Sequence, residues 1–159
     1  MKTVIIEERE RIESIILRSE VCFVGMTDLE GNPYVIPMNF GYSDGSIYLH
    51  SAPEGEKLEM LEKNNRVCIT FSVGHELVYQ HPTMACSYSM RSESAQCKGT
   101  VHFLETSDEK LQALNIIMKQ YSDREFKYSE PSVRNVKVWQ VEVQQMTGKV
   151  FGLRPNEQP

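Results

Sequence analysis

The chain has 159 residues, of which 40% are hydrophobic, and its formal net charge is -5 at pH 7. This length suits one domain with a buried core, and we expect a single domain over residues 1–159. A mildly acidic chain without a basic stripe is not expected to bind nucleic acid. No apolar run is long enough to span a bilayer, so we expect no membrane partner.

The first residues and the cysteines favour a cytoplasmic location. Acidic residues and an arginine follow Ile5 and Ile6 directly, which leaves no apolar region of the kind that signal peptides carry. The four cysteines are scattered without a Cys-x-x-Cys pair, so neither a zinc ribbon nor a thioredoxin motif is present. Cys22 and Cys68 lie in apolar, strand-like runs and are expected in the core.

The first half of the chain predicts a helix, several strands and a second helix. Ile12, Ile15 and Ile16 recur at helical spacing within residues 7–19. Residues 34–42 and 46–51 read as two strands joined by a tight turn at Asp44 and Gly45. The other elements expected here are a strand at 21–26, a loop at 28–33, a helix from 56 to 64 or 65, and a strand at 66–73.

The second half predicts two more strands and one helix. A capping box at Thr106 and Glu109 opens a helix with one apolar face. The other segments are a loop at 74–82, a long strand at 84–105 that bends near 91–94, a polar loop at 121–135, and an alternating strand at 136–143. About six antiparallel strands with short helices predict a mainly β fold, a small barrel with helical decoration.

A hydroxyl, a lysine and a helix start come together after the strand at 46–51. Ser51 ends that strand, and a Pro-Glu-Gly turn leads from it to Lys57 at the beginning of the next helix. Such a combination can bind a phosphate group through the hydroxyl, the ammonium and free backbone N–H groups. The alternative is a polar turn that carries a solvated lysine.

Three other residues have both a functional and a structural interpretation. His50 ends a strand and can act as a proton donor, stack on an aromatic ligand, or serve the fold alone. Pro37 interrupts a strand, which indicates an edge or a bulge whose free backbone groups can meet a planar heterocycle. Trp139 can line a pocket or an interface, or it can pack in the core. His75, His81 and Cys86 suggest a metal site only weakly, because their spacing matches no known ligand pattern, and we predict no metal.

The order of short motifs resembles one known family. Val-Ile-Pro-Met-Asn-Phe-Gly-Tyr is followed by Asp-Gly, then by Ile-Tyr-Leu-His-Ser and by Gly-x-Lys. This order is similar to the pyridoxamine 5′-phosphate oxidase-like FMN-binding proteins, and within them to the nitroimidazole-resistance (Nim) branch. The run at 89–99 and the ending Val-Trp-Gln-Val-Glu-Val with Met-Thr-Gly-Lys resemble that branch too, so the likeness covers residues 10–150.

The resemblance implies a six-stranded antiparallel split β-barrel that forms a homodimer, with FMN, or else FAD, in each of two clefts between subunits. His50 would lie beside the flavin ring as the candidate catalytic residue, and Lys57 would bind the phosphate. The complete set of implied cofactor-binding residues is Pro37, Met38, Asn39, Phe40, Leu49, His50, Ser51, Lys57, Ser94, Ala95 and Trp139.

The implied activity is a flavin-dependent reductase. It would transfer electrons from a reduced nicotinamide to a small acceptor such as a nitroimidazole or another nitroaromatic. Only Lys57 stands where true pyridoxamine phosphate oxidases have an arginine-lysine pair, so oxidation of vitamin B6 is not expected. The alternative is a non-catalytic flavin or haem protein that stores or senses its ligand, since a strand-end imidazole such as that of His50 can ligate haem iron.

Overall fold

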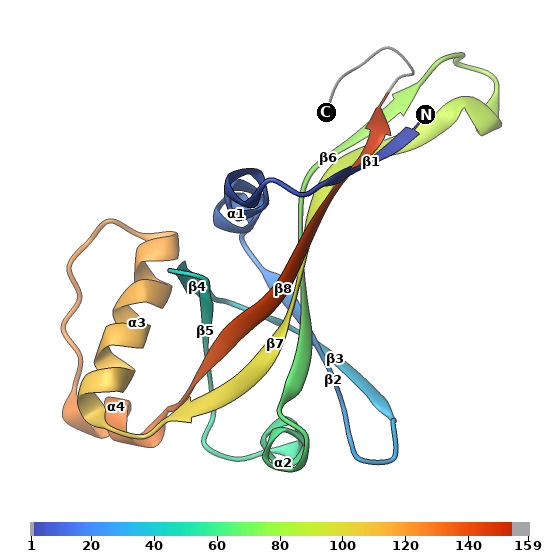
Figure 1. The fold of residues 1–159 in the computed structure, drawn as a ribbon. Coiled ribbons are helices and arrows are strands. Elements are labelled where there is room, and N and C mark those ends of the chain that lie inside the picture. Colours follow the sequence, from blue (N-terminus) through green and yellow to red (C-terminus); the bar gives the residue numbers. More distant parts are fainter. Residues whose placement is uncertain (1, 154–159) are drawn as a thin grey trace. The chain divides into compact units, whose positions relative to one another are not determined.

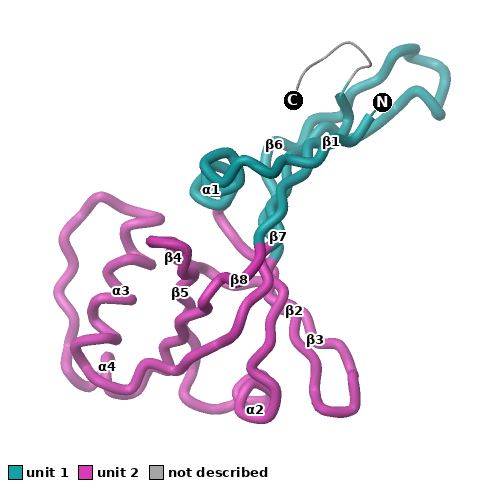
Figure 2. Tube along the Cα trace, viewed as in Figure 1, with its two compact units in different colours: residues 1–19, 70–96, 146–159 teal, residues 20–69, 97–145 magenta. Residues whose placement is uncertain are grey.

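The computed structural model describes residues 2–153, which form a mainly β chain with short helices. The chain divides into two compact units (Figure 2). Unit 1 comprises the described residues of 1–19, 70–96 and 146–159, and unit 2 comprises residues 20–69 and 97–145. No helix in the described part of the chain is long and apolar enough to cross a membrane.

The strand pairs β1–β8, β2–β3, β4–β5 and β5–β8 are antiparallel, and the sheet has the order β3-β2-β6-β7-β8-β5-β4, with β1 paired to β8. The sheet of the described part thus holds eight strands, seven along an open path and β1 paired to β8 off this path, so a closed barrel of six strands is not confirmed. The strands are β1 Lys2–Ile6, β2 Cys22–Thr27, β3 Pro33–Met38, β4 Gly41–Ser43, β5 Ser46–Ser51, β6 Arg66–Tyr79, β7 Tyr88–Leu104 and β8 Lys137–Leu153 (Figure 1). The three long strands β6, β7 and β8 contribute residues to both units.

Unit 2 contains the β2–β3 and β4–β5 hairpins and the helices α2 (Glu56–Lys63), α3 (Ser107–Tyr121) and α4 (Glu130–Asn135). The β4–β5 turn has positive φ angles at Asp44 (49°) and Gly45 (78°), which confirms the predicted tight turn. The predicted capping box is present as well: the backbone N–H of Glu109 donates to Thr106 Oγ1, and the Thr106 N–H donates to Glu109 Oε2.

Helix α3 packs directly on β4. A Cβ atom added to Gly41 would lie 2.6 Å from the backbone nitrogen of Ile117 and 2.7 Å from the carbonyl oxygen of Ile116. Real Cβ atoms do not approach backbone atoms so closely, so only glycine fits at this point of the β4 strand. The buried face of α3 includes Ala113 and Ile117.

Unit 1 is built around α1 (Arg9–Arg18), whose buried residues are Ile12, Ile15 and Ile16, as their spacing predicts. The strand β1 pairs with the end of β8, where Gly148 lies against Ile6 and Ile12. These apolar contacts form the core of unit 1 together with buried residues of β6 and β7 such as Phe71 and Ala95.

The boundaries differ from the prediction at several places. The expected loop at 74–82 is mostly strand, because β6 continues to Tyr79, and the expected bend of β7 near 91–94 does not interrupt that strand. The expected loop at 121–135 contains α4. The expected strand at 34–42 is broken into β3 and β4 at Asn39 and Phe40, where the Phe40 N–H donates to a tyrosine hydroxyl. The strand β1 was not predicted.

Candidate functional site

The centre of the candidate site in unit 2 is the pair of strands β5 and β8. Leu49 lies opposite Trp139, and both side chains are fully buried. The Phe103 ring meets the indole of Trp139 edge-on, with 6.3 Å between the ring centroids and an angle of 86° between the planes. Two of the predicted cofactor-binding residues are therefore neighbours, and their side chains belong to the core of this chain.

Trp139 has one polar atom that the core does not satisfy. Its Nε1 is buried, and no hydrogen-bond acceptor lies within reach among the described residues. A buried donor without an acceptor costs about 1–3 kcal/mol, so such atoms are rare in folded proteins. This unsatisfied donor is one observation that fits a polar ligand next to the β5–β8 pair.

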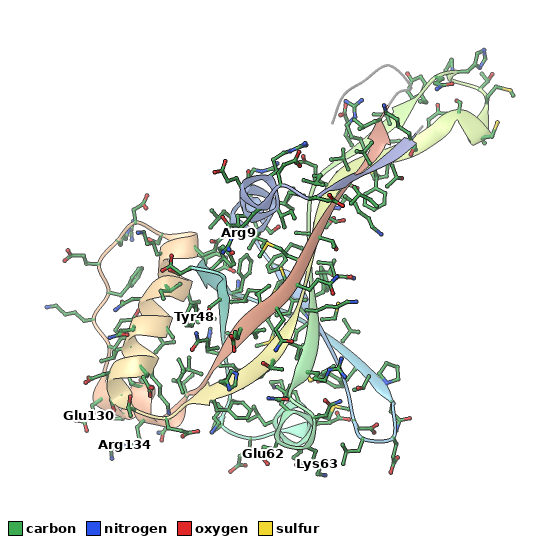
Figure 3. The ribbon with its side chains drawn as sticks, viewed as in Figure 1. Arg9, Tyr48, Glu62, Lys63, Glu130 and Arg134 are labelled. Atoms are coloured by element: carbon green, nitrogen blue, oxygen red, sulfur yellow. The ribbon has the colours of Figure 1, made fainter. Side chains whose placement is uncertain are left out.

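His50 and Ser51 point to opposite faces of β5, because side chains alternate along a strand. His50 lies opposite Val138 and on the same face as Tyr48, which is next to α3 in Figure 3. Ser51 lies opposite Lys137 on the face of Leu49. One ligand can therefore contact both side chains only at the end of the strand, and β5 does end at Ser51.

His50 is exposed overall, but its imidazole is partly desolvated. Partial burial lowers the pKa of His50 below its ordinary value. The imidazole is therefore neutral at pH 7, with one ring nitrogen that carries a proton and one that can accept one.

Ser51 and Lys57 flank the turn that leads into α2. The Ser51 hydroxyl donates to the carbonyl oxygen of Ala52 at 2.8 Å, which leaves its oxygen lone pairs available. Gly55 precedes the helix with a φ angle of 133°, a conformation that side chains rarely adopt. Lys57 is half-buried in the first turn, and its ammonium forms no ion pair with a described residue. The exposed Lys63, labelled in Figure 3, lies in the last turn of the same helix.

Pro37 lies in β3, the edge strand of the sheet, as its position in the sequence predicts. It is exposed and opposite Phe23, whereas the next residue, Met38, is buried opposite Cys22. Asn39 is exposed in the break between β3 and β4, and Phe40 is fully buried. The side chains of this segment therefore alternate between solvent and core.

Tyr121 fixes the break between β3 and β4, a role that no motif in the sequence predicted. The backbone N–H of Phe40 donates to Tyr121 Oη at 3.0 Å, and the Tyr121 hydroxyl donates to the carbonyl oxygen of Glu20 at 2.9 Å. Tyr121 is the last residue of α3, next to the predicted loop. No pattern in the neighbouring sequence predicts that Tyr121 forms a hydrogen bond with a residue 81 positions away.

Ser94 and Ala95 belong to the part of β7 in unit 1 and are described with that unit. Ala95 is fully buried and Ser94 is half-buried. Their neighbour Glu93 forms an ion pair with Arg18 of α1. The other nine predicted residues all lie in unit 2.

The three residues that the sequence weakly suggested as metal ligands lie in unit 1, where the two histidines form ordinary polar contacts. His75 Nε2 lies 2.9 Å from Ser72 Oγ, and His81 Nδ1 lies 3.2 Å from Thr83 Oγ1. Cys86 is exposed. Within residues 2–153, no three histidine, cysteine or acidic side chains are gathered so that they could hold a metal ion.

The antiparallel sheet with short helices and the polar residues that follow the end of β5 are typical of one class of protein. Comparison with known proteins identifies this class. A family model described as pyridoxamine 5′-phosphate oxidase matches residues 8–150, and the chain belongs to this family. The resemblance seen in the sequence is thereby confirmed. No curated protein matched the chain in a separate sequence comparison.

Solved structures support the same assignment. A protein of Bacteroides thetaiotaomicron VPI-5482, proposed to act in 5-nitroimidazole antibiotic resistance, is 66% identical, with a TM-score of 0.87 over 98% of this chain and 92% of that chain. The flavocytochrome Anf3 of Azotobacter vinelandii is 18% identical, with a TM-score of 0.81 over 97% of this chain and 72% of that one. An FAD and haem binding protein of Mycobacterium smegmatis is 15% identical, with a TM-score of 0.84 over 97% and 76%. The last two similarities concern the fold alone.

Proposed function

We propose that this protein is a homodimeric, FMN-binding oxidoreductase that uses NADH or NADPH to reduce a small acceptor such as a nitroimidazole or another nitroaromatic. The observation that carries the proposal is the end of β5, where an imidazole, a hydroxyl and a lysine at a helix start follow one another in unit 2. Membership of the pyridoxamine 5′-phosphate oxidase family supports the flavin, and the 66% identical relative supports the nitroimidazole.

The phosphate end of the cofactor would lie at the start of α2. The first backbone N–H groups of a helix are free of helical partners and favour an anion. Glu56 and Glu59 place negative charge in the same turn and oppose a phosphate there. Binding of the phosphate therefore depends on the ammonium of Lys57, with the Ser51 oxygen as an additional hydrogen-bond partner.

The ring end would lie along residues 37–40 and beside His50. A bound flavin would supply the redox chemistry, since it accepts hydride from a reduced nicotinamide and passes electrons to an acceptor. The exposed Asn39 amide can both donate and accept hydrogen bonds at the rim of a heterocycle. His50 can hold a proton on one ring nitrogen and deliver it to an acceptor that has gained electrons.

The buried residues of the predicted set would act differently. Phe40, Leu49 and Trp139 are fully buried and would support the cleft from beneath, while the unsatisfied indole N–H of Trp139 is available to a polar atom of the ligand. A second copy of the chain would close the cleft, and the edge strand β3 with the exposed Pro37 would border it on this side.

The visible spectrum of the purified protein before and after addition of FMN tests the proposal. We expect flavin absorption that remains with the protein after gel filtration. Anaerobic mixing with NADH or NADPH should bleach this absorption, and a nitroimidazole should restore it. A protein that retains no flavin after incubation with FMN would contradict the proposal.

A second candidate function is a non-catalytic flavin or haem protein, which the exposed, neutral imidazole of His50 favours. Haem bound through this imidazole would give a Soret band that a His50→Ala variant loses. A bound flavin that neither nicotinamide reduces would also favour this second function over the first.

A further inference from the structure

The sheet surface of unit 2 has a hollow of about 480 Å³ outside the site described above. Residues of β2, β3, β6, β7 and β8 line it, and no residue assigned to the flavin is among the lining residues that the structure describes. Its volume lies in the range of about 300–1,000 Å³ that is usual for small-molecule sites. Gly25 is part of its wall, and because no side chain stands there a ligand can approach the backbone of β2.

Two cations line the hollow, Arg66 of β6 and Lys98 of β7. Both are exposed, and neither side chain forms an ion pair or a hydrogen bond with a described residue. No carboxylate is among the described residues that line the hollow, although the chain as a whole has 22 acidic and 17 basic residues. This local excess of positive charge in an acidic chain attracts an anionic ligand.

Asn64 fixes the start of β6, from which the Arg66 side chain projects. Its Nδ2 donates to the Thr27 carbonyl oxygen at 3.1 Å and to Thr27 Oγ1 at 3.2 Å, and its Oδ1 accepts the Arg66 N–H at 3.4 Å. The Val101 N–H donates to the Asn65 carbonyl oxygen at 2.8 Å, which ties the same segment to β7. The backbone of Arg66 is thereby held on both sides, and its guanidinium is available for a bidentate pair with a phosphate.

The hollow and the segment assigned to the flavin ring share one face of β3. Pro33 and Val35 line the hollow, and Pro37, two residues further along, begins that segment. Side chains alternate along a strand, so these three residues lie on the same face. At about 3.3 Å per residue, the distance from Pro33 to Pro37 is roughly 13 Å. An elongated ligand with phosphates in the hollow can therefore extend to the ring.

We infer that the hollow binds the phosphate groups of the nicotinamide donor, and that this donor is NADPH. The inference rests on the proposed function, which requires a reduced nicotinamide. In Rossmann folds a carboxylate bonds to the ribose 2′-hydroxyl of NAD, whereas an arginine accommodates the 2′-phosphate of NADP. The hollow has the arginine and, among its described lining residues, no carboxylate. Arg66 and Lys98 pair with the phosphates, and the nicotinamide reaches the ring along the face of Pro33 and Pro37.

Titration with NADP⁺ and with NAD⁺ tests the inference without any turnover. Isothermal titration calorimetry gives both affinities for the wild type and for the variants Arg66→Gln, Lys98→Gln and Lys127→Gln. Lys127 is an exposed lysine of unit 2 that does not line the hollow, so its variant controls for the loss of one positive charge. The flavin absorption of each protein is recorded after addition of FMN, and circular dichroism checks folding.

We expect the wild type and Lys127→Gln to bind NADP⁺ more tightly than NAD⁺. Arg66→Gln and Lys98→Gln should each bind NADP⁺ about tenfold more weakly, as is typical for the loss of one charge-assisted hydrogen bond, and should retain FMN as the wild type does. Equal affinities of the wild type for NADP⁺ and NAD⁺, or NADP⁺ binding by either variant as strong as by the control, would overturn the inference. A loss of FMN from Arg66→Gln would also overturn it, because the hollow would then belong to the flavin.

The proposed function and this inference can fail separately. A protein that binds NADP⁺ through Arg66 and Lys98 but retains no FMN contradicts only the proposed function. A protein that retains FMN and has the same affinity for NADP⁺ in all variants contradicts only this inference. Inorganic pyrophosphate is titrated in the same way, and binding of pyrophosphate without binding of NADP⁺ would overturn the assignment of the hollow to the donor.

Discussion

The hydroxyl of Tyr121 accepts the backbone N–H of Phe40 at 3.0 Å and so ties the end of α3 to the break between β3 and β4. The same hydroxyl donates to the Glu20 carbonyl oxygen, which precedes β2. One side chain thereby fixes the segment along which the flavin ring is proposed to lie, although it is not itself in the proposed site.

A Tyr121→Phe variant should lose stability and flavin affinity together. Without the hydroxyl, the Phe40 N–H has lost its acceptor, which costs about 1–3 kcal/mol of unfolding free energy. Urea unfolding and an FMN titration measure the two effects. Tyr128→Phe is a matched control, because the buried Tyr128 hydroxyl has no hydrogen-bond partner among the described residues. Equal losses in the two variants would show that the Tyr121 hydrogen bonds are unimportant.

A Lys57→Gln variant should bind FMN more weakly and riboflavin as well as before. The ammonium would form a charge-assisted hydrogen bond with the phosphate, worth about 1.5–3 kcal/mol, which corresponds to roughly 10–100-fold in affinity. Riboflavin lacks the phosphate, so it reports on the ring alone. Lys63→Gln removes the same charge from the last turn of α2 and should leave both affinities unchanged. A loss of riboflavin binding in Lys57→Gln would contradict the assignment of Lys57 to the phosphate.

His50 should titrate below the ordinary histidine pKa of about 6.5. Partial burial lowers the pKa of His50 in the folded state, so the unfolded chain takes up this proton first as the pH falls. The contribution of His50 to stability is therefore present above about pH 6.5 and is lost as the pH falls towards the folded-state pKa. Proton NMR of the histidine rings, assigned with a His50→Gln variant, measures the pKa directly. A midpoint at or above the ordinary value would refute the expectation.

Trp139 should report ligand binding by its fluorescence. It is the only tryptophan of the chain, so the emission comes from the β5–β8 core alone. FMN bound nearby should quench this emission with the same midpoint as the flavin titration. Trp139→Phe keeps a ring and removes the unsatisfied N–H, so it should cost less stability than Trp139→Ala, for which about 3–5 kcal/mol is typical. Quenching that does not saturate with FMN would show that the flavin binds elsewhere.

Local patterns in the sequence predicted those features that local interactions determine. The spacing of Ile12, Ile15 and Ile16 predicted α1, and the Thr106–Glu109 capping box predicted the start of α3. Pro37 predicted an edge strand because a proline cannot donate a ladder hydrogen bond. Each of these predictions needs only residues that are close in the chain.

The features that the sequence analysis missed depend on contacts between distant residues. β1 is a strand only because β8 pairs with it, and at the break after β3 the Phe40 N–H donates to the Tyr121 hydroxyl. The opposite directions of His50 and Ser51 follow from alternation, but the burial of Trp139 opposite Leu49 depends on which strands are neighbours. Which strands pair is not encoded in either strand alone.

The close packing of α3 on Gly41 limits which sequences can adopt this structure. Any larger residue at position 41 would push the backbone of Ile116 and Ile117 away, and α3 carries Tyr121 at its end. A substitution at Gly41 would therefore displace the Tyr121 hydroxyl from the Phe40 N–H although Tyr121 and Phe40 themselves are unchanged. In a library randomised at this one codon and selected for flavin fluorescence, glycine should be the residue that survives.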